Sequence, residues 1–593
     1  MRRSTTKYYI MQFRKKILAL LLLQLVAFAP LYSQTVKKYF VYLKDKANSP
    51  YLIDKPEEFL SKRAIERRQK QNIAITTRDF PVNPSYITQI KSTGASVWYS
   101  SRWMNAVLIE VADTTLTKVQ ALSFVNNTTV LNRGRLLPQV NEDGKESRRS
   151  KRRRRRERRR RKRNQQSQTP QIKNSNVGLR TTEEILIESK EDYGNSYKQD
   201  SIVGADIMHA SGYRGKGIWI AVFDSGFQNV DKLSFFSHMF TNQNIAGTYD
   251  FVTNQPNVYN TGSHGTKVLS TVAAYEKGVM IGTAPEATYW LFRTEDVGGE
   301  YRDEEVYWLI AAERADSTGV DIINSSLGYN TFDDVSMNYT YQNMDGNTTL
   351  ITKAADFAAA TGMLVVNSAG NEGNSSWKYI AAPADGDSVL TVGSVNSDGA
   401  YSSFSSTGKT SDGRIKPNVS AMGAFVMLGG PFGPSSGSGT SFSSPIVCGL
   451  AAGFWQANPT LTNMQVIDYL QRSASQADKP DDLLGYGIPH FRNAMELVKN
   501  PTSISSVSES GFSFYPNPID GSQYLKIVFN QTYQGKQIKM QLLDAQGKPV
   551  ATQSLSSAPK EYNWERLQFL KSGVYILRIS NGQQSQSMKI VKR

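Results

Sequence analysis

The stretch GIWIAVFDSGF, residues 217–227, is an apolar run that ends in a carboxylate and a glycine turn. Similar apolar runs follow it along the chain, separated by helical patterns. The strands predicted in this way are GIWIAVF (217–223), TYWLFR (288–293), VDIINSSL (320–327), MLVVNSA (363–369) and SVLTVGSV (388–395). Apolar strands that alternate with helices are typical of a parallel sheet covered on both faces. The sequence therefore predicts an α/β fold over residues 193–500, with helices near 304–317, 351–361 and 441–457.

Four polar residues occupy positions in this fold where chemistry is expected. Asp224 ends the first apolar run, and Asn371 follows another run in the glycine-bounded turn SAGNEG. His264 in SHGTKV and Ser441 in GTSFSSP each stand where a helical pattern begins. Each residue alone has an ordinary explanation as a cap, a turn residue or a buried orienting group. Together, at strand ends and helix starts of one domain, they predict a serine nucleophile with a base and an oxyanion site.

The segments AVFDSGF, SHGTKV, SAGNEG and GTSFSSP closely resemble the four signature segments of subtilisin-like serine peptidases, in the order of that family. The resemblance covers roughly residues 193–500 and implies a mostly parallel sheet with helices on both faces. It implies that Ser441 is the nucleophile, His264 the general base and Asp224 the group that orients the imidazole. Asn371 would stabilise the oxyanion together with the backbone N–H of Ser441. The reaction would pass through an acyl-enzyme and require no metal or organic cofactor.

The segment NSSLGY, residues 324–329, resembles the substrate-binding strand of the family, whose backbone pairs with an extended peptide. The residues to which the resemblance assigns substrate contacts are Ser326, Leu327, Gly328, Ser368 and Gly370. None of them is charged, so a broad or apolar preference is expected. Tyr329 replaces the small residue expected there and predicts narrowed or reshaped neighbouring subsites. Many family members are stabilised by calcium, which makes calcium the candidate structural ion.

The chain begins with the pattern of an export signal. Basic residues at 14–16 precede the apolar stretch 17–29, which is shorter than the roughly 20 residues of a membrane span. We therefore predict a signal peptide over residues 1–33. Residues 34–140 predict a small α+β unit and resemble, through KYFVYLKD and WMNAVLIEV, the propeptide of subtilisin-like peptidases. The resemblance implies an intramolecular inhibitor, and an ordinary accessory domain is the alternative.

The net charge of +17 comes mainly from one short segment. Residues 148–163 hold fourteen Lys and Arg against one acid, which leaves only +4 for the rest of the chain. The surrounding stretch, residues 141–192, has few apolar residues and predicts a basic disordered linker. It contains no aromatic residues between the arginines for base stacking, and the chain is predicted to be exported, so no nucleic-acid partner is expected. The single cysteine, Cys448, excludes an intrachain disulfide.

After a short linker at 501–511, residues 512–593 show alternating strands punctuated by Pro, Gly and Asn. This pattern predicts a small β-sandwich. The segments FYPNP (514–518), GVYILRI (573–579) and KIVKR (589–593) resemble the sorting domain of the type IX secretion route across a Gram-negative outer membrane. The resemblance implies that the secretion machinery is a partner and that the protein is secreted or held at the cell surface.

These features predict the exported zymogen of a subtilisin-like serine endopeptidase. Its partners would be protein or peptide substrates and its own propeptide. The alternative from another functional class is a catalytically silent binding module at the cell surface on the same fold. The presence of all four motif residues favours the peptidase.

Overall fold

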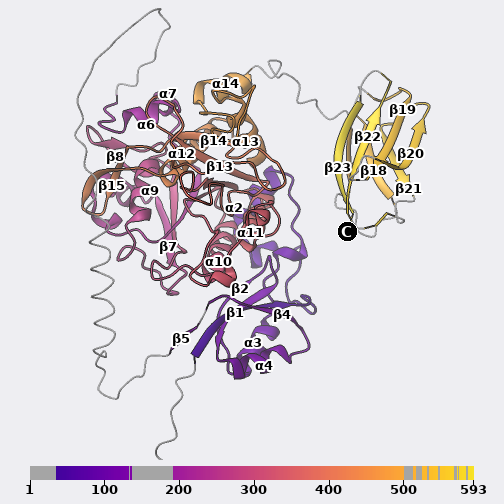
Figure 1. Ribbon diagram of the computed structural model, residues 1–593, viewed down its shortest axis with the longest axis horizontal. Helices are drawn as coiled ribbons and strands as arrows, with labels where there is room; N and C mark the ends of the chain where they lie inside the picture. Colours follow the sequence, from indigo (N-terminus) through magenta and orange to yellow (C-terminus); the bar gives the residue numbers. More distant parts are fainter. Residues whose placement is uncertain are drawn as a thin grey trace, which may run out of the picture. The chain divides into compact units, whose positions relative to one another are not determined.

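The computed structural model describes residues 35–132, 134–136, 191–499 and most of the strands between 512 and 592 (Figure 1). The chain divides into two compact units, Met1–Glu496 and Leu497–Arg593. Three predicted segments lie outside the described residues: the signal peptide 1–33, almost all of the linker 141–192 and the linker 501–511. Within the part that is described, no helix is long and apolar enough to cross a membrane.

The first unit is built around a seven-stranded sheet in which every neighbouring pair is parallel. Its order is β14-β13-β12-β11-β6-β10-β7. The strands are β6 (Trp219–Asp224), β7 (Ile245–Asp250), β10 (Thr288–Arg293), β11 (Ile322–Ser325), β12 (Leu364–Ser368), β13 (Val389–Val395) and β14 (Val419–Met422). The chain leaves β6 toward one side of the sheet and later returns to fill the other. The carboxyl end of β6 is therefore at the topological switch point, where open α/β sheets place their sites.

Helices cover both faces of this sheet. On β6, Ala221 and Phe223 share a core with α10 (Asp303–Thr318) and α11 (Leu350–Ala360), and Phe223 meets the Trp308 ring edge-on at 5.3 Å. Successive side chains of a strand point to opposite faces, so the alternate β6 residues face the other layer. That layer holds α9 (His264–Ala273) and α12 (Thr440–Ala457), which pack against each other. The predicted fold class is confirmed.

The ends of α10 follow from its sequence. Three acids occupy its first turn, where they complement the positive end of the helix dipole. Gly319 ends the helix with a φ of +91°, a left-handed conformation that a glycine adopts without steric strain.

The N-terminal part of this unit is a small antiparallel sheet with three α-helices. The strand order is β2-β3-β1-β4, and the short β5 pairs with β1. Its elements are β1 (Thr35–Leu43), α2 (Lys62–Lys70), α3 (Pro84–Ser92), β2 (Ser96–Ser101), β3 (Ala106–Val111), α4 (Asp113–Gln120), β4 (Val125–Val130) and β5 (Arg135–Leu136). Along β3, Ala106 and Leu108 belong to the core shared with α10, whereas Val107 and Ile109 belong to a core with α3 and α4. One face of the small sheet is therefore covered by the larger domain.

A buried ion network joins these two parts of the chain. Asp316, near the end of α10, is fully buried and forms ion pairs with Arg67, Arg68 and Arg102. Burial opposes its charge, but the three guanidinium groups outweigh burial and lower its pKa. Nearby, Glu313 accepts the backbone N–H of Arg102 at 2.9 Å. Buried charges of this kind are tolerated only when each one is paired.

The second unit contains two antiparallel sheets, with orders β17-β18-β21 and β20-β19-β22-β23. The strands are β17 (Phe512–Tyr515), β18 (Tyr524–Phe529), β19 (Ile538–Leu543), β20 (Pro549–Leu555), β21 (Glu561–Glu565), β22 (Gly573–Ser580) and β23 (Ser585–Lys592). Residues from both sheets, such as Leu525, Trp564, Met540 and Leu577, form one core. This is the predicted small β-sandwich.

Candidate active site

Two of the four motif residues meet at the carboxyl end of β6. Asp224 is its last residue and is fully buried, while His264 is the first residue of α9. His264 Nδ1 lies 2.9 Å from each carboxylate oxygen of Asp224. Burial lowers the pKa of the imidazole, but attraction to Asp224 and the hydrogen bond outweigh it, so the pKa lies above its usual value. The His264 side chain is 38% exposed, which leaves its other edge accessible.

Ser441 is the second residue of α12, and its backbone N–H belongs to the first turn, which has no intrahelical acceptor. Its hydroxyl donates a long hydrogen bond of 3.5 Å to the carbonyl of Ser326. Because α12 begins at Thr440, Pro445 lies inside the helix, beyond its first turn. Pro445 cannot donate to the carbonyl of Ser441, and that carbonyl instead accepts the hydroxyl of Ser326 at 2.8 Å.

Asn371 lies just after β12, next to the start of α12. Its Oδ1 accepts the backbone N–H of Thr440 at 2.9 Å and the Thr440 hydroxyl at 3.1 Å. Because Thr440 occupies the oxygen, the amide nitrogen is the group left to donate to a ligand. Asn371 is exposed, so such a ligand can reach it.

The predicted substrate residues lie beside this start of α12. Ser326, Leu327 and Gly328 follow β11, and the side chain of Asn367 holds the Leu327 carbonyl at 3.0 Å. Ser368 ends β12, and the N–H of Gly370 donates to the Thr440 hydroxyl at 3.2 Å. Gly328 is exposed, so its backbone is open to an extended peptide.

Tyr329 does not occupy the place that the sequence suggested. Its side chain is only 1% exposed, its ring stacks on Phe332, and its hydroxyl donates to Glu295. The Tyr329 side chain therefore points into the protein interior, away from the surface on which a peptide would bind, and does not itself narrow the cleft. Its large side chain fits here because Glu295 gives the buried hydroxyl a partner.

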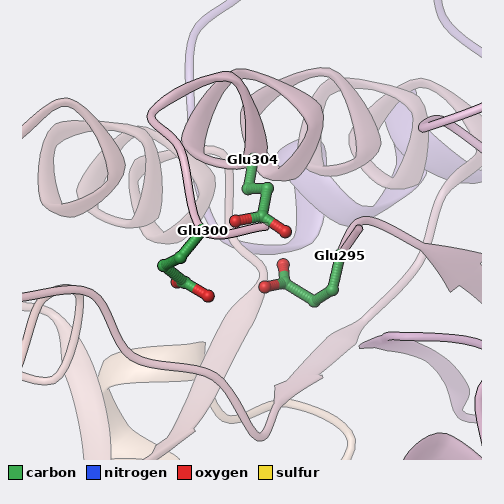
Figure 2. Close-up of side chains that lie close together, drawn as sticks. All are labelled: Glu295, Glu300 and Glu304. Atoms are coloured by element: carbon green, nitrogen blue, oxygen red, sulfur yellow. The ribbon is translucent and has the colours of Figure 1, made fainter. Parts of the chain in front are cut away.

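A group of three carboxylates next to the site was not found from the sequence. Figure 2 shows Glu304 reaching from α10, Glu300 from the loop before it and Glu295 from just after β10, with their carboxylates converging. One oxygen from each carboxylate lies within 4.8 Å of the other two. Burial and neighbouring carboxylates raise the pKa of Glu295 to about 8, of Glu300 to about 7 and of Glu304 to about 11. The acid-rich stretch TEDVGGEYRDEE was the only sequence signal for this group.

These carboxylates offer the hard oxygen donors that Ca²⁺ prefers. Within residues 191–499, no lysine or arginine forms an ion pair with Glu295, Glu300 or Glu304. A divalent cation would relieve the repulsion between the crowded carboxylates. The donor set therefore fits the calcium ion that the sequence resemblance suggests.

A parallel sheet with a buried Asp–His pair and a serine at a helix start defines the class of α/β serine hydrolases. Comparison with known proteins narrows the class. The model of the Subtilase family matches residues 215–487. The model of the Peptidase S8 propeptide domain of Bacteroidota matches 38–153, and that of the Secretion system C-terminal sorting domain matches 513–593.

Individual relatives agree with these models. Subtilisin from Bacillus pumilus is 35% identical over 279 residues, which cover 46% of this chain and 90% of that relative. Subtilisin E from Bacillus subtilis (strain 168) is also 35% identical over 279 residues, and the chain spans only 65% of its length. The chain belongs to the subtilase family. Among solved structures, MycP1 from the ESX-1 type VII secretion system is similar over 52% of this chain and 87% of its own, with 21% identity and a TM-score of 0.41.

Proposed function

We propose that this subtilase is made as a zymogen and acts, once processed, as a secreted serine endopeptidase. The observation that carries the proposal is the placement of His264 Nδ1 2.9 Å from both oxygens of a fully buried Asp224, in a chain of this family. The sorting domain supports export and a partnership with the secretion machinery.

In the proposed reaction, the Ser441 hydroxyl attacks the scissile carbonyl while His264 Nε2 takes its proton. Asp224 holds the Nδ1–H and stabilises the imidazolium that forms. The tetrahedral oxyanion accepts hydrogen bonds from the Asn371 amide and the Ser441 N–H. His264 then protonates the leaving amine, which departs and leaves an acyl-enzyme. Water, deprotonated by His264, hydrolyses that ester and restores Ser441.

The direct test is labelling of the processed protein by a fluorophosphonate, together with hydrolysis of casein. We expect the wild type to be labelled and active, and the Ser441→Ala variant to show neither property. A folded and processed wild type that is neither labelled nor active would contradict the proposal and favour the silent binding module.

The N-terminal part of the first unit, which resembles a propeptide, is proposed to inhibit the catalytic domain until this part is released. The buried ion pairs between Asp316 of the catalytic domain and three arginines of this N-terminal part support the role. We expect Asp316→Asn to speed dissociation of the cleaved propeptide by roughly 10²- to 10³-fold, because three buried guanidinium groups lose a shared carboxylate and, within the described residues, only Arg68 keeps a second one, that of Asp79. The rate at which activity appears after processing measures this effect.

A matched control is Arg63→Ala, which removes a less buried ion pair to Asp321 across the same interface. Partly exposed pairs contribute about 0–1 kcal/mol, so dissociation should change by less than roughly fivefold. Equal effects of Asp316→Asn and Arg63→Ala would refute the central role of the buried network.

We also propose that Glu295, Glu300 and Glu304 hold a structural calcium ion. We expect a chelator to lower the melting temperature at pH 8, and calcium at 100 times its Kd to restore about 2.7 kcal/mol of stability. Glu300→Gln, which alters the partly exposed donor, should weaken the response to calcium. A melting temperature that is the same with chelator and with calcium would exclude this role.

A further inference from the structure

Phe425 combines two unusual features near the nucleophile. It lies between β14 and the hairpin of β15 (Val426–Gly430) and β16 (Gly433–Gly437), and its neighbours Ala424 and Val426 are buried. Phe425 itself is 82% exposed. Its φ of +57° is in the left-handed region, which is an outlier conformation for a bulky residue. Such a conformation is strained and is kept where surrounding contacts enforce it, often at functional sites.

The contacts that enforce this conformation come from the loop that leads into Ser441. The N–H of Phe425 donates to Ser438 Oγ at 3.0 Å, and the N–H of Gly439 donates to the Gly423 carbonyl at 2.8 Å. Gly423 has no room for a Cβ, because Ser443 in the first turn of α12 packs against it. The backbone that carries the exposed ring is therefore fixed relative to the nucleophile.

The sheet order, together with the hairpin that follows Phe425, indicates which part of a substrate this ring can meet. The segment proposed to bind the acyl side of the peptide follows β11, and the predicted walls of the P1 pocket follow β12. Phe425 follows β14, two strands further along the same edge. The hairpin that begins after Phe425 packs against α9, whose first residue, His264, would protonate the leaving amine, and the N–H of Gly429 donates to Ser270 Oγ of α9 at 2.8 Å. The ring of Phe425 is thus on the leaving-group side of Ser441.

We propose that Phe425 contacts the substrate residues that follow the scissile bond and gives the enzyme a preference for apolar side chains there. The inference rests on the proposed peptidase function and adds a determinant of specificity to it. A solvent-exposed aromatic ring gains by covering an apolar side chain and gains little from an anionic one, because the face of the ring carries partial negative charge.

The test compares processed wild type with Phe425→Asn and Phe425→Gly, since Asn and Gly accept a positive φ. Two quenched peptides differ only in having Leu or Asp at the first position after the scissile bond, and a peptide p-nitroanilide has no residue there. We expect kcat/KM for the Leu peptide to fall roughly tenfold, the scale of losing one apolar contact. Values for the Asp peptide and the anilide should change less than twofold.

Phe432→Ala is the control, because Phe432 is 89% exposed at the turn between β15 and β16 and its loss also removes an exposed phenyl ring from this hairpin. It should alter none of the three values. Equal losses on all three substrates would show that Phe425 acts only structurally, and no loss on any would show that it makes no contact. Both results overturn the inference while the wild type stays active; an unlabelled, inactive wild type would instead overturn the proposed function and this inference with it.

Discussion

The His264→Ala variant is expected to lose about 10⁶-fold in kcat with little change in KM. The size of this loss is the one known for this family. Without the imidazole, nothing takes the proton from Ser441 or returns it to the leaving amine. The oxyanion donors and the substrate segment are left in place, so roughly 10³- to 10⁴-fold acceleration over water should survive.

This experiment needs a processed enzyme, so the variant is cleaved by an added peptidase before kcat is measured with a p-nitroanilide. His238→Ala is the control, since His238 is a half-buried histidine of α8 (Ser237–Thr241) that hydrogen-bonds the Pro285 carbonyl. The control should keep its kcat. A loss of less than 100-fold in His264→Ala, with the fold intact, would disprove its role as the base.

The Asp224→Asn variant is expected to lose about 10⁴-fold in kcat, because the amide cannot hold the same tautomer of His264. It should also move the pH profile. Attraction to Asp224 raises the pKa of His264, so the wild type should lose activity as the pH falls through a value above 6.5. Removal of the charge lowers that pKa, so the neutral base persists and the acid limb shifts to lower pH.

The measurement is kcat/KM against pH for both proteins, which reports the free enzyme. Asn is nearly isosteric with Asp, and a melting temperature within a few degrees of the wild type would show that the fold is kept. An acid limb at the same pH in both proteins would mean that Asp224 does not control the imidazole.

The sequence predicted the central elements of the fold because their residues are apolar throughout. All five predicted strands are present, and α12 begins one residue before the predicted start. The strand β7, Ile245–Asp250, was missed because IAGTYD lies at the sheet edge, where a continuous apolar run is not required. The strand β14 has only four residues, too few for a pattern to show.

The motif residues could be named from sequence because each is tied to a strand end or a helix start. The cluster of three carboxylates could not be predicted from sequence. Glu295 and Glu304 are nine positions apart and converge only when β10 and α10 pack together. The arginines of α2 were equally hidden. Their charge gives no sequence signal of burial, yet Arg67 and Arg68 are buried against α10.

Pro445 has no backbone N–H to donate within α12, and this absence has a mechanical consequence. Because Pro445 leaves the Ser441 carbonyl free for Ser326, the segment that would grip a peptide is tied directly to the residue that would attack it. If a peptide binds along Ser326, a shift in its position would pass through this hydrogen bond to the backbone of Ser441, so the two sides of the cleft would move together.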